Sequence, residues 1–368
     1  MKFLHLADLH LGKKLAGFSL IEDQRHILFY ALDRCVAKGV KTVLLCGDIY
    51  DTAIPTQAAT SLLSEFLVKA NNLGIKVLLI PGNHDSSERL GFASSLLNSE
   101  GVYIVSTLEE ALEPIKIEGV NFYLLPFFKH YDVNRAFGTN CVSYEEATEL
   151  LIEKMNLDKN LPNVLLCHQT VFLKGKDLIR SSSEDVAIGD VANIDANVFE
   201  DFTYVALGHI HKAQKVAPNA YYPGAIYKYH VDEADYEKTF CFVEISEKGF
   251  KQEFEPMDYI RNLRVIRGTM EEILQKEPSE DYVFLVLLDE VPVNNAMEKA
   301  RRVFPYCIGL RYEVKDRESS TPLEEPVLIE NASPIEMLTS FYKWTMQEEL
   351  SDAQKELAIS LFEGGEEE

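Results

Sequence analysis

The sequence has no apolar run long enough to cross a membrane. Its longest run of aliphatic and phenylalanine residues is Val283–Leu288, whereas a membrane helix needs roughly 20 apolar residues. The apolar run before Asp8 is also too short for a secretory signal peptide. We therefore expect a cytoplasmic protein that makes no contact with a membrane.

The sequence also lacks the paired cysteines of zinc ribbons and redox motifs. None of its six cysteines belongs to a C-x-x-C pair; they stand at positions 35, 46, 141, 167, 241 and 307. Without export they should be reduced thiols. Cys46 and Cys167 each end an apolar run, which is typical of small core residues. We therefore expect no cysteine-based zinc or redox site.

Basic residues are scarce for a protein that acts on nucleic acid. The chain has 36 Lys and Arg against 59 Asp and Glu, a formal net charge of −23. Such an average field repels DNA, and free-standing DNA-binding proteins are usually basic. A function on DNA therefore requires that the acidic residues lie away from the site or that a partner supplies affinity. The acidic tail 363–368 shows some segregation, although a solvated terminal charge run is the simpler explanation.

The first part of the chain alternates short apolar runs with longer amphipathic stretches. The ranges 3–7, 42–46 and 75–80 are typical of buried parallel strands, and 22–38 and 57–72 have helical spacing. A glycine closes each helical stretch, as is common after helix ends. Strand, helix, strand, helix, strand in this order predicts an α/β fold.

The remainder of the chain divides into smaller parts. A strand–helix–strand–helix–strand pattern from residue 263 to 314 predicts a small α/β domain, and two helices with N-cap and capping-box signals follow. The polar stretch 174–190 between two buried strands has the length of a functional loop. We predict a main domain over 1–260, a small capping domain over 261–316, a linker over 317–331 and a helix pair over 332–363.

Side chains that can bind metals follow five of the buried strands. Because ligands gather beyond the carboxyl ends of the strands in α/β sheets, these side chains should meet at one edge. Carboxylate, amide and imidazole groups suit manganese, magnesium, iron or zinc. The candidates are Asp8, His10, Asp48, Asn83, His168, His209 and His211, with His84 and Asp85 beside them.

Each of these motifs alone also has a simpler explanation. A lone Asp at a strand end is more often a turn or helix cap, and Gly82-Asn83 is by itself a turn signal. A lone buried histidine usually bonds a backbone carbonyl, and we interpret His5, His26, His130 and His230 as structural. Five motifs in order, each directly after an apolar strand, are hard to obtain by chance. Jointly they predict a metal site.

The motif set D-x-H, G-D-x-x-D, G-N-H-D, a lone H and G-H-x-H resembles that of the calcineurin-like metallophosphoesterases. The stretches HLADLHLGKKLAGFSLIEDQ, LLCGDIYDTAIPT and LLIPGNHDSSERL, with the order of elements to residue 368, resemble the SbcD family. That family is the bacterial counterpart of the nuclease in Mre–Rad repair complexes. The resemblance covers nearly the whole chain and implies a two-sheet α/β sandwich flanked by helices, a small α/β capping domain and a C-terminal helix pair.

The resemblance also implies a role for each motif residue. Asp8, His10 and His211 would hold one metal, and Asn83, His168 and His209 another, with Asp48 bridging both. The metals would be two Mn(II) ions, with Mg or another divalent cation as alternatives. His84 matches the family's non-ligand histidine, which would protonate or stabilise the departing sugar oxygen. Asp85 could orient His84 or be a turn carboxylate, and Asp51 would support the site from behind.

The implied function is a DNA nuclease of repair and recombination, with exonuclease action on double-stranded ends and endonuclease action on single strands or hairpins. The family resemblance further implies a homodimer, within a heterotetramer, and a SbcC-type ATPase partner with a long coiled coil. The chain itself has no G-x-x-x-x-G-K-[ST] motif, so ATP hydrolysis must come from another chain. The C-terminal helices would bind the root of that coiled coil, or else pack back on the body.

Two other functions remain compatible with the sequence. One is a phosphodiesterase or phosphatase acting on small molecules, although Thr52-Ala53 and Asp85 depart from the Ser/Thr phosphatase pattern. The other is a non-catalytic adaptor that tethers an ATPase to DNA, which would need no ligand set. Contacts to DNA phosphates could come from Lys13, Lys14 and Arg89 beside the site loops, or these side chains could simply be solvated.

Overall fold

The computed structural model describes residues 1–175, 178–184, 193–246, 249–313, 333–346 and 349–363. The chain divides into two compact units, Met1–Glu313 and Val314–Glu368. The predicted linker 317–331 lies outside the described residues. The domain borders that we placed at residues 260, 316 and 331 stay predictions.

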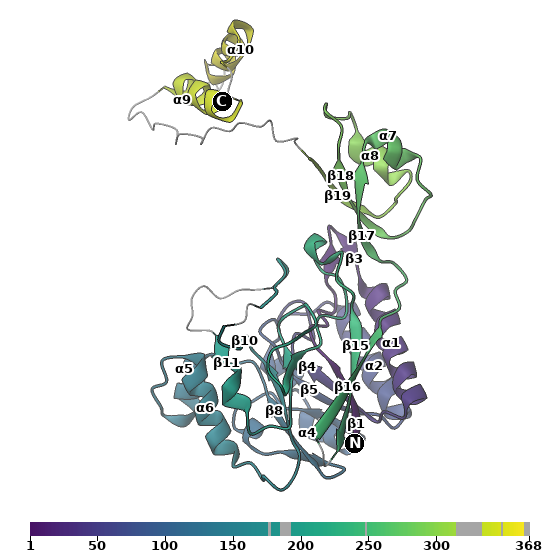
Figure 1. Cartoon of the computed structure of the whole chain (residues 1–368), viewed down its shortest axis with the longest axis vertical. Helices are drawn as coiled ribbons and strands as arrows, with labels where there is room; N and C mark the ends of the chain where they lie inside the picture. Colours follow the sequence, from purple (N-terminus) through teal and green to yellow (C-terminus); the bar gives the residue numbers. More distant parts are fainter. Residues whose placement is uncertain (176–177, 185–192, 247–248, 314–332, 347–348, 364–368) are drawn as a thin grey trace. The chain divides into compact units, whose positions relative to one another are not determined.

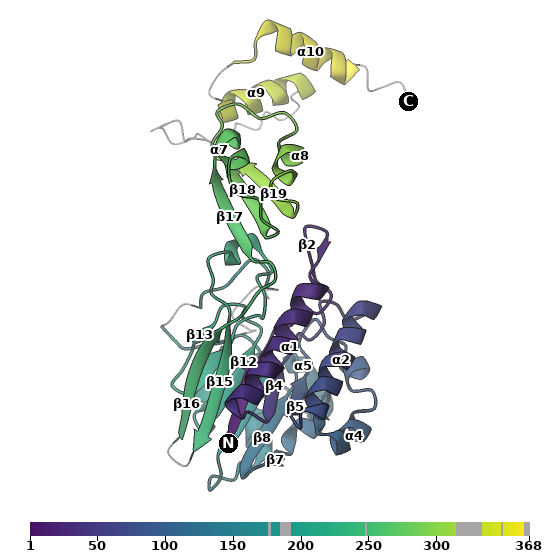
Figure 2. The ribbon, with the colours of Figure 1, turned by 90° about the vertical axis from the view of Figure 1, so that its right-hand side faces the viewer.

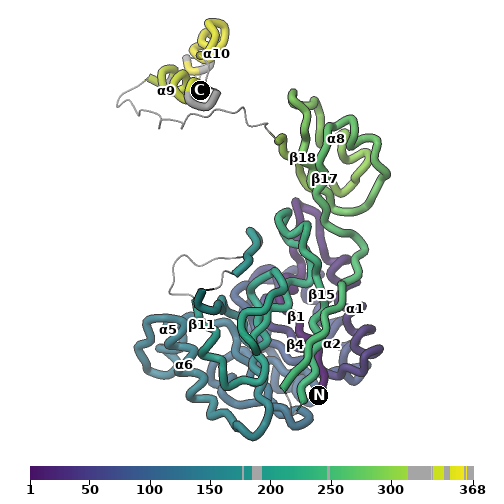
Figure 3. The backbone as a smooth tube through the Cα atoms, in the orientation of Figure 1, coloured from purple at the N-terminus to yellow at the C-terminus, as the bar shows by residue number. Residues whose placement is uncertain are grey.

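The first unit contains two six-stranded mixed sheets. The first sheet has the order β16-β15-β1-β4-β5-β6, in which β1, β4, β5 and β6 are parallel and β15 and β16 run antiparallel to their neighbours. Its strands are β1 Lys2–Leu6, β4 Thr42–Cys46, β5 Lys76–Ile80, β6 Val102–Ile104, β15 Thr239–Ser246 and β16 Gly249–Pro256. Figure 3 shows β15 returning from late in the sequence to lie beside β1.

The second sheet has the order β13-β14-β12-β9-β8-β7, with β14, β12, β9 and β8 parallel. Its strands are β7 Ile115–Ile117, β8 Val120–Leu125, β9 Asn163–His168, β12 Tyr204–Gly208, β13 Gln214–Lys215 and β14 Ala220–Tyr222. Two short pairs lie outside the sheets: β2 Lys14–Leu15 with β3 Phe18–Ser19, and β10 Val171–Phe172 with β11 Ile194–Asp195.

The main core lies between the two sheets. Alternate residues of the first sheet, such as Phe3 and Leu44, pack in one apolar cluster with Phe122 and Val205 of the second. The intervening residues pack with helices instead, because successive side chains of a strand point to opposite faces. Both faces of the central strands are therefore buried, which explains their continuous apolar runs.

Helices flank the sheets on both outer sides (Figure 1). Figure 2 shows α1 and α2 side by side along the first sheet. Residues of α6 pack in the cluster of the second sheet. The helices of this part are α1 Ile21–Lys38, α2 Gln57–Asn72, α3 Ser87–Leu90, α4 Ser94–Leu97, α5 His130–Phe137 and α6 Tyr144–Met155. Single 3₁₀ turns are η1 Asn98–Glu100, η2 Glu110–Leu112, η4 Ala196–Phe199 and η5 Val231–Glu233.

The predicted small α/β pattern forms a three-stranded parallel sheet with its own apolar cluster. The order is β17-β18-β19, and two short helices connect the strands. Thr269 caps α7 with the predicted capping box, since its side chain accepts the Glu272 N–H and the Glu272 carboxylate accepts the Thr269 N–H. The elements are β17 Leu263–Gly268, α7 Met270–Leu274, β18 Tyr282–Leu287, α8 Ala296–Arg301 and β19 Cys307–Tyr312.

The second unit contains α9 Pro334–Met346 and α10 Asp352–Glu363, which contact each other. Both predicted capping boxes form: Ser333 pairs with Glu336, and Ser351 pairs with Gln354. Phe341 and Phe362 are among the exposed large apolar residues of the two helices. None of the helices in the described ranges combines the length and apolarity that crossing a membrane requires.

Candidate metal centre

The seven predicted ligand residues meet where the two sheets adjoin. Five parallel strands, β1, β4 and β5 of the first sheet and β9 and β12 of the second, end there. Asp8 and His10 follow β1, Asp48 follows β4 and Asn83 follows β5, while His168 ends β9 and His209 and His211 follow β12. The sheet edge therefore collects side chains that are up to 203 positions apart, from Asp8 to His211.

One group of potential ligands consists of Asp8, His10 and His211. Each offers an atom within 4.8 Å of the others' atoms. The Nε2 atoms of His10 and His211 face each other at 3.1 Å, and His10 Nε2 lies 3.6 Å from Asp48 Oδ2. Two imidazole nitrogens that point at one another share at most one hydrogen bond, so this arrangement suits a cation better than it suits the side chains alone.

A second group consists of Asn83, His168 and His209. The Asn83 Oδ1 atom lies 3.1 Å from His168 Nε2 and 3.1 Å from His209 Nδ1. His168 Nε2 is also 3.4 Å from Asp48 Oδ1. The two carboxylate oxygens of Asp48 thus face the two groups, one oxygen each. This is the placement that a carboxylate bridging two cations would have.

The burial of the site leaves its charges uncompensated by solvent. The exposed fractions of Asp8, His10 and His168 are 0 %, and those of Asp48 and His211 are 2 % and 1 %. The Asp8 Oδ2 atom is buried without a hydrogen-bond partner. An orphaned carboxylate oxygen of this kind is costly unless a cation binds it. The donor set, with oxygen and imidazole nitrogen and no thiolate, fits a divalent metal.

The pKa values of the site follow from this burial. Burial raises the pKa of Asp8 to about 8. Burial also opposes ionisation of Asp48, but the neighbouring His168, His10 and His84 outweigh it and hold the pKa of Asp48 well below its usual value. Burial disfavours the charged form of His168, yet the Asp48 carboxylate dominates and raises the pKa of His168 to about 9. Asp8 is thus stabilised by its own proton and Asp48 by positive charge on the neighbouring histidines, and a divalent cation would meet both needs.

Backbone strain is concentrated at the same residues. Asp8, His10 and Asp48 have φ values of 53°, 42° and 48°, and His209 has a φ of 103°. Such values are uncommon for residues other than glycine. The His209 N–H donates to Asp8 Oδ1 at 2.9 Å, which helps to hold this conformation. The surrounding fold therefore imposes geometry that the residues would not adopt by themselves.

The glycines of the motifs permit the close approach of the two sheets. A Cβ on Gly208 would lie 1.8 Å from the Cys46 carbonyl oxygen, and one on Gly47 would lie 2.2 Å from His168 Nδ1. His168 Nδ1 donates to the Cys46 carbonyl at 2.8 Å, which leaves Nε2 to face the cluster. The G-D and G-H pairs of the sequence are thus steric requirements of the site.

His84 lies beside the cluster but is less enclosed. Its Nδ1 is 2.9 Å from the Asp51 carbonyl oxygen, and its Nε2 is 4.0 Å from Asp48 Oδ2. Its side chain is 19 % exposed, against 3 % for Asp48. Distance alone also groups His84 with His10 and Asp48 as a potential ligand. Its predicted role as a non-ligand acid stays a prediction.

Asp85 connects two of the motif loops. Its carboxylate accepts hydrogen bonds from the N–H groups of Gly82, Ile49 and Tyr50 at 2.8–2.9 Å. It therefore joins the loop after β4 to the loop after β5. Burial raises the pKa of Asp85 to about 6, although these N–H groups oppose the shift. Its predicted orientation of His84 stays a prediction.

Other residues around the site were only partly foreseen. The Asp51 carboxylate lies 3.6 Å from His10 Nδ1 and 2.8 Å from Lys13 Nζ, and its supporting role stays a prediction. Lys13 is thus paired, while Lys14 and Arg89 are exposed. Gln24 of α1 donates to the Leu9 and His10 carbonyls, a contact for which the sequence held no signal.

The long polar stretch 174–190 also reaches the site. Residues 176–177 and 185–192 of it lie outside the described residues. Within the described part, Ser183 and Glu184 contact His211. Glu233 and Lys238, which follow β14 in the chain, complete this surrounding. The polar loop was predicted to be functional, but these four residues were not.

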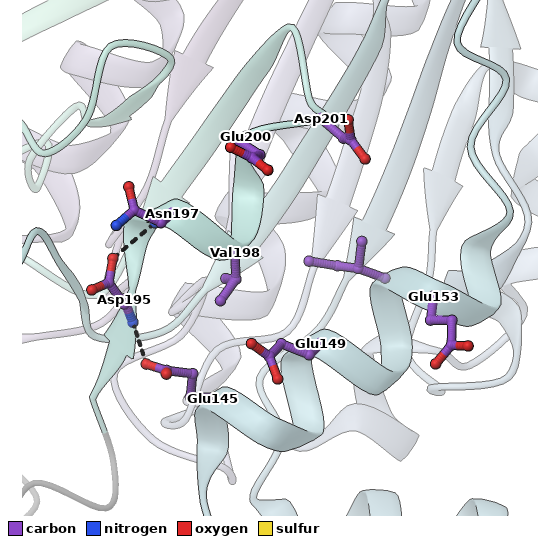
Figure 4. A pocket seen from close by; sticks show the side chains of 9 residues that line it. Glu145, Glu149, Glu153, Asp195, Asn197, Val198, Glu200 and Asp201 are labelled. Carbon is purple, nitrogen blue, oxygen red and sulfur yellow. Dashed lines mark hydrogen bonds between the residues drawn. The ribbon is translucent and has the colours of Figure 1, made fainter.

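Part of the chain's acidic charge gathers in a surface pocket between α6 and the segment around η4. Figure 4 shows Glu145, Glu149 and Glu153 from α6 with Glu200 and Asp201. None of the seven candidate ligands lines this pocket. Some of the negative charge therefore lies outside the metal centre, in keeping with one of the two conditions for a function on DNA.

Comparison with known proteins gave matches over most of the chain. Residues 1–213 match the family model described as calcineurin-like phosphoesterase, and residues 260–345 match the one described as type 5 capsule protein repressor C-terminal domain. A curated protein of Staphylococcus epidermidis, the SbcD subunit of nuclease SbcCD, is 31 % identical over 367 residues, which cover 97 % of this chain and 96 % of that protein. Its namesake in Staphylococcus saprophyticus is 30 % identical over 364 residues, which are 96 % of each chain.

Similarity to solved structures is weaker. The crystal structure of TT1561 of Thermus thermophilus is 11 % identical, with a TM-score of 0.41 over 69 % of this chain and 98 % of that one. A dimetal phosphatase from Danio rerio is 12 % identical, with a TM-score of 0.37 over 70 % and 99 % of the two chains.

Proposed function

Because this chain belongs to the calcineurin-like phosphoesterases, and among them to the family of the SbcD subunit of nuclease SbcCD, we propose that it is a metal-dependent DNA nuclease. It would be the subunit that cleaves phosphodiester bonds in a complex with a SbcC-type ATPase. The observation that carries the proposal is the buried cluster at the shared edge of the two sheets, where Asp48 faces both groups of potential ligands.

The proposal assigns each potential ligand to one of two cations. Asp8, His10 and His211 would hold the first, Asn83, His168 and His209 would hold the second, and Asp48 would bind to both. Two Mn(II) ions are proposed from the family resemblance; the donor set of oxygen and imidazole nitrogen would also suit Mg or another divalent cation. When bound, such a pair of cations activates water and neutralises charge on the phosphate oxygens.

The protein's own residues perform the remaining steps. His84, more exposed than the bridging candidate Asp48, faces the substrate and gives a proton to the departing sugar oxygen. The Asp51 carbonyl oxygen accepts from its Nδ1 and so sets the orientation of the ring. Asp85 keeps the two loops that carry Asp48 and His84 in register.

The proposed substrates are double-stranded DNA ends for exonuclease action and single strands or hairpins for endonuclease action, in the cytoplasm. The partner offsets the repulsion that arises from the net charge of −23. The helices α9 and α10 bind the root of its coiled coil. A homodimer completes a heterotetramer, as the family resemblance implies.

The test is digestion of linear and circular plasmid DNA with manganese, the SbcC-type partner and ATP. Shortening of the linear form, with the circular form spared, is expected for an exonuclease of duplex ends. Hydrolysis of a bis-nitrophenyl phosphate ester, measured in parallel, reports the phosphodiesterase centre alone. Ester hydrolysis without any DNA cleavage would favour the small-molecule phosphodiesterase, and neither activity would favour the adaptor.

A further inference from the structure

Three polar atoms of His211, its main-chain N–H and carbonyl and its Nδ1, form hydrogen bonds with residues outside the ligand candidates. Its main-chain N–H donates to Glu184 Oε1 at 2.9 Å, and its main-chain carbonyl accepts from Lys238 Nζ at 2.8 Å. Its Nδ1 lies 2.6 Å from Ser183 Oγ. The remaining polar atom, Nε2, faces His10 in the cluster. The ring can therefore direct only one nitrogen towards a cation.

The direction of these hydrogen bonds follows from the charges around Ser183. Its hydroxyl lies 2.5 Å from Glu233 Oε1, and Glu233 Oε2 lies 2.6 Å from Lys238 Nζ. Ser181 Oγ lies 2.6 Å from Ser183 Oγ and donates to the same Glu233 oxygen at 3.0 Å. A carboxylate paired with an ammonium group only accepts hydrogen bonds, and the contact of Ser183 with it is the shorter of the two, so the single hydroxyl proton of Ser183 points to Glu233. The hydroxyl oxygen must then accept from Nδ1–H of His211. The proton of the imidazole is thereby placed on Nδ1 and the lone pair on Nε2.

We propose that Ser183, Glu233 and Lys238 are positioning residues of the metal centre, which fix His211 in the Nδ1–H tautomer and so set its affinity for the cation. This inference rests on the proposed function, because it takes His211 to be a ligand. The chain of contacts runs from Lys238 through Glu233 and Ser183 to the ring. Groups that bond the far nitrogen of a metal-binding histidine orient it and increase its basicity.

The burial of the ion pair supports a positioning role. Glu233 and Lys238 are 0 % and 3 % exposed. Because desolvation offsets most of the attraction of such a pair, stability gives little reason to bury it. The geometry of the pair gives a better reason. The Lys238 ammonium group donates to the His211 main-chain carbonyl and also holds Glu233, the carboxylate that accepts the Ser183 hydroxyl proton.

The serine run provides a matched control within the same segment. Ser182 is exposed and its hydroxyl bonds Asp232 Oδ2 at 2.7 Å, away from the ring of His211. Ser183 is the neighbour that bonds the ring. Substitution of Ser182 therefore removes an equivalent hydroxyl from the same loop and leaves the contacts between Lys238, Glu233, Ser183 and His211 in place. Ser183→Thr keeps the hydroxyl, whereas Ser183→Ala removes it.

The first measurement is the tautomer of His211 in the metal-free full chain, read by nitrogen NMR of ¹⁵N-histidine protein. We expect the Nδ1–H form in the wild type, Ser182→Ala and Ser183→Thr, and a loss of that form in Ser183→Ala. If these substitutions acted only by loosening the loop, His211 would have no single preferred tautomer in Ser182→Ala either. If Ser183→Ala does not fold, Glu233→Gln is measured instead. The uncharged amide of the glutamine no longer holds the hydroxyl proton of Ser183 firmly.

The second measurement is manganese binding by titration calorimetry of the same proteins. We expect Ser183→Ala to weaken one binding event by roughly 10- to 100-fold and to leave the other unchanged. An unchanged tautomer in Ser183→Ala overturns the proposal, and so does a changed tautomer with unchanged manganese affinity. Failure of the wild type to bind manganese would instead overturn the proposed function. The tautomer measurement would still decide whether Ser183 fixes the tautomer of His211.

Discussion

At the scale of single residues, His84 is separated by its exposure from the most enclosed ligand candidates, Asp8, His10 and His168. Its side chain is 19 % exposed, and its nearer contact is a main-chain carbonyl rather than a carboxylate. A group that gives a proton to the leaving oxygen must be accessible to the substrate. A ligand, in contrast, is expected to be enclosed like Asp8 or His168.

The substitution His84→Gln separates these two roles. We expect manganese stoichiometry and affinity to be retained while the rate of DNA cleavage falls by roughly 100- to 10,000-fold, the usual contribution of a general acid. Calorimetry measures binding, and digestion of linear DNA with the partner and ATP measures cleavage. Loss of one manganese ion would show that His84 is a ligand, as its proximity to His10 and Asp48 permits. Unchanged cleavage would remove it from the mechanism.

A second residue-scale prediction concerns His5, which lies in the core between the sheets. Its Nδ1 lies 3.0 Å from the Tyr204 hydroxyl and its Nε2 lies 3.1 Å from the Leu207 carbonyl oxygen. Burial lowers the pKa of His5 to about 3. The unfolded chain, with a pKa near 6.5, therefore binds more protons between pH 3 and 6.5. Stability from this group is complete above pH 6.5 and decreases as the pH falls.

Urea unfolding of the wild type and His5→Gln at several pH values tests this prediction. Below pH 6 the wild type should lose about 1.4 kcal/mol per pH unit more than the variant, because one proton is taken up on unfolding. Titration of the many carboxylates is common to both proteins and cancels in the difference. His230→Gln, which changes an exposed histidine, is the control. Parallel curves for wild type and His5→Gln would contradict the prediction.

At the scale of secondary-structure elements, the end of β12 crosses the end of β4 with no room for a side chain. Gly208→Ala would place a Cβ 1.8 Å from the Cys46 carbonyl oxygen, and backbone cannot yield as a side chain can. We expect a loss of about 3 kcal/mol in the free energy of unfolding, at the upper end for overpacking. Metal binding should weaken too, because His168 and His209 adjoin this crossing.

The control for this prediction is Gly39→Ala at the C-terminal cap of α1. Gly39 has a φ of 67° and no heavy atom within 4 Å of the added Cβ, so only backbone strain opposes the change. A cost of about 1 kcal/mol is expected there. Urea denaturation of both variants gives the comparison. Equal losses would mean that the steric contact at Gly208 is relieved by a small shift of the sheets.

The elements also show which parts of the site the sequence could predict. Asp8, Asp48 and His168 each stand next to an apolar strand, and parallel strands necessarily bring their carboxyl ends to one edge. Local pattern therefore sufficed to bring these residues together. Ser183 and Glu233 are 50 positions apart and flank no strand of either six-stranded sheet, so their meeting at His211 depends on how loops pack. No local signal carries that information.

The fold was predictable to a similar extent and for the same reason. Alternating strands and helices with capping signals at Thr269 and Ser333 have short-range causes, and the structure contains them. The two-sheet architecture, which the structure confirms, was predicted from the family resemblance. No local pattern in the first half of the sequence predicts that β15 pairs with β1. That pairing joins residues separated by more than 200 positions.

At the scale of the whole molecule, the negative charge is concentrated in the second unit. Residues 314–368 contain 4 of the 36 basic and 14 of the 59 acidic residues, and so carry −10 of the net −23. Residues 1–313 carry the remaining −13. The net charge of the whole chain therefore overstates the repulsion between DNA and residues 1–313. The same segment holds α9 and α10, the proposed contacts to the ATPase.

Removal of residues 314–368 should consequently separate catalysis from coupling to the partner. The three apolar clusters of the catalytic unit draw only on residues before 314 among those described, so the shortened chain should unfold at an unchanged temperature. Manganese-dependent hydrolysis of a bis-nitrophenyl phosphate ester should be retained. Binding to duplex DNA by the isolated chain should strengthen at low salt, because ten negative charges are lost.

Cleavage of linear DNA should, in contrast, no longer respond to the partner and ATP, because the helices proposed to dock the partner are gone. Calorimetric titration of the partner into each form measures docking directly. A matched full-length variant with Phe341→Asp and Phe362→Asp keeps the chain length but places charge on exposed apolar positions of α9 and α10. It should lose the partner like the shortened chain. If either protein still binds the partner with full affinity, the docking surface lies on residues 1–313, and the two helices have another function.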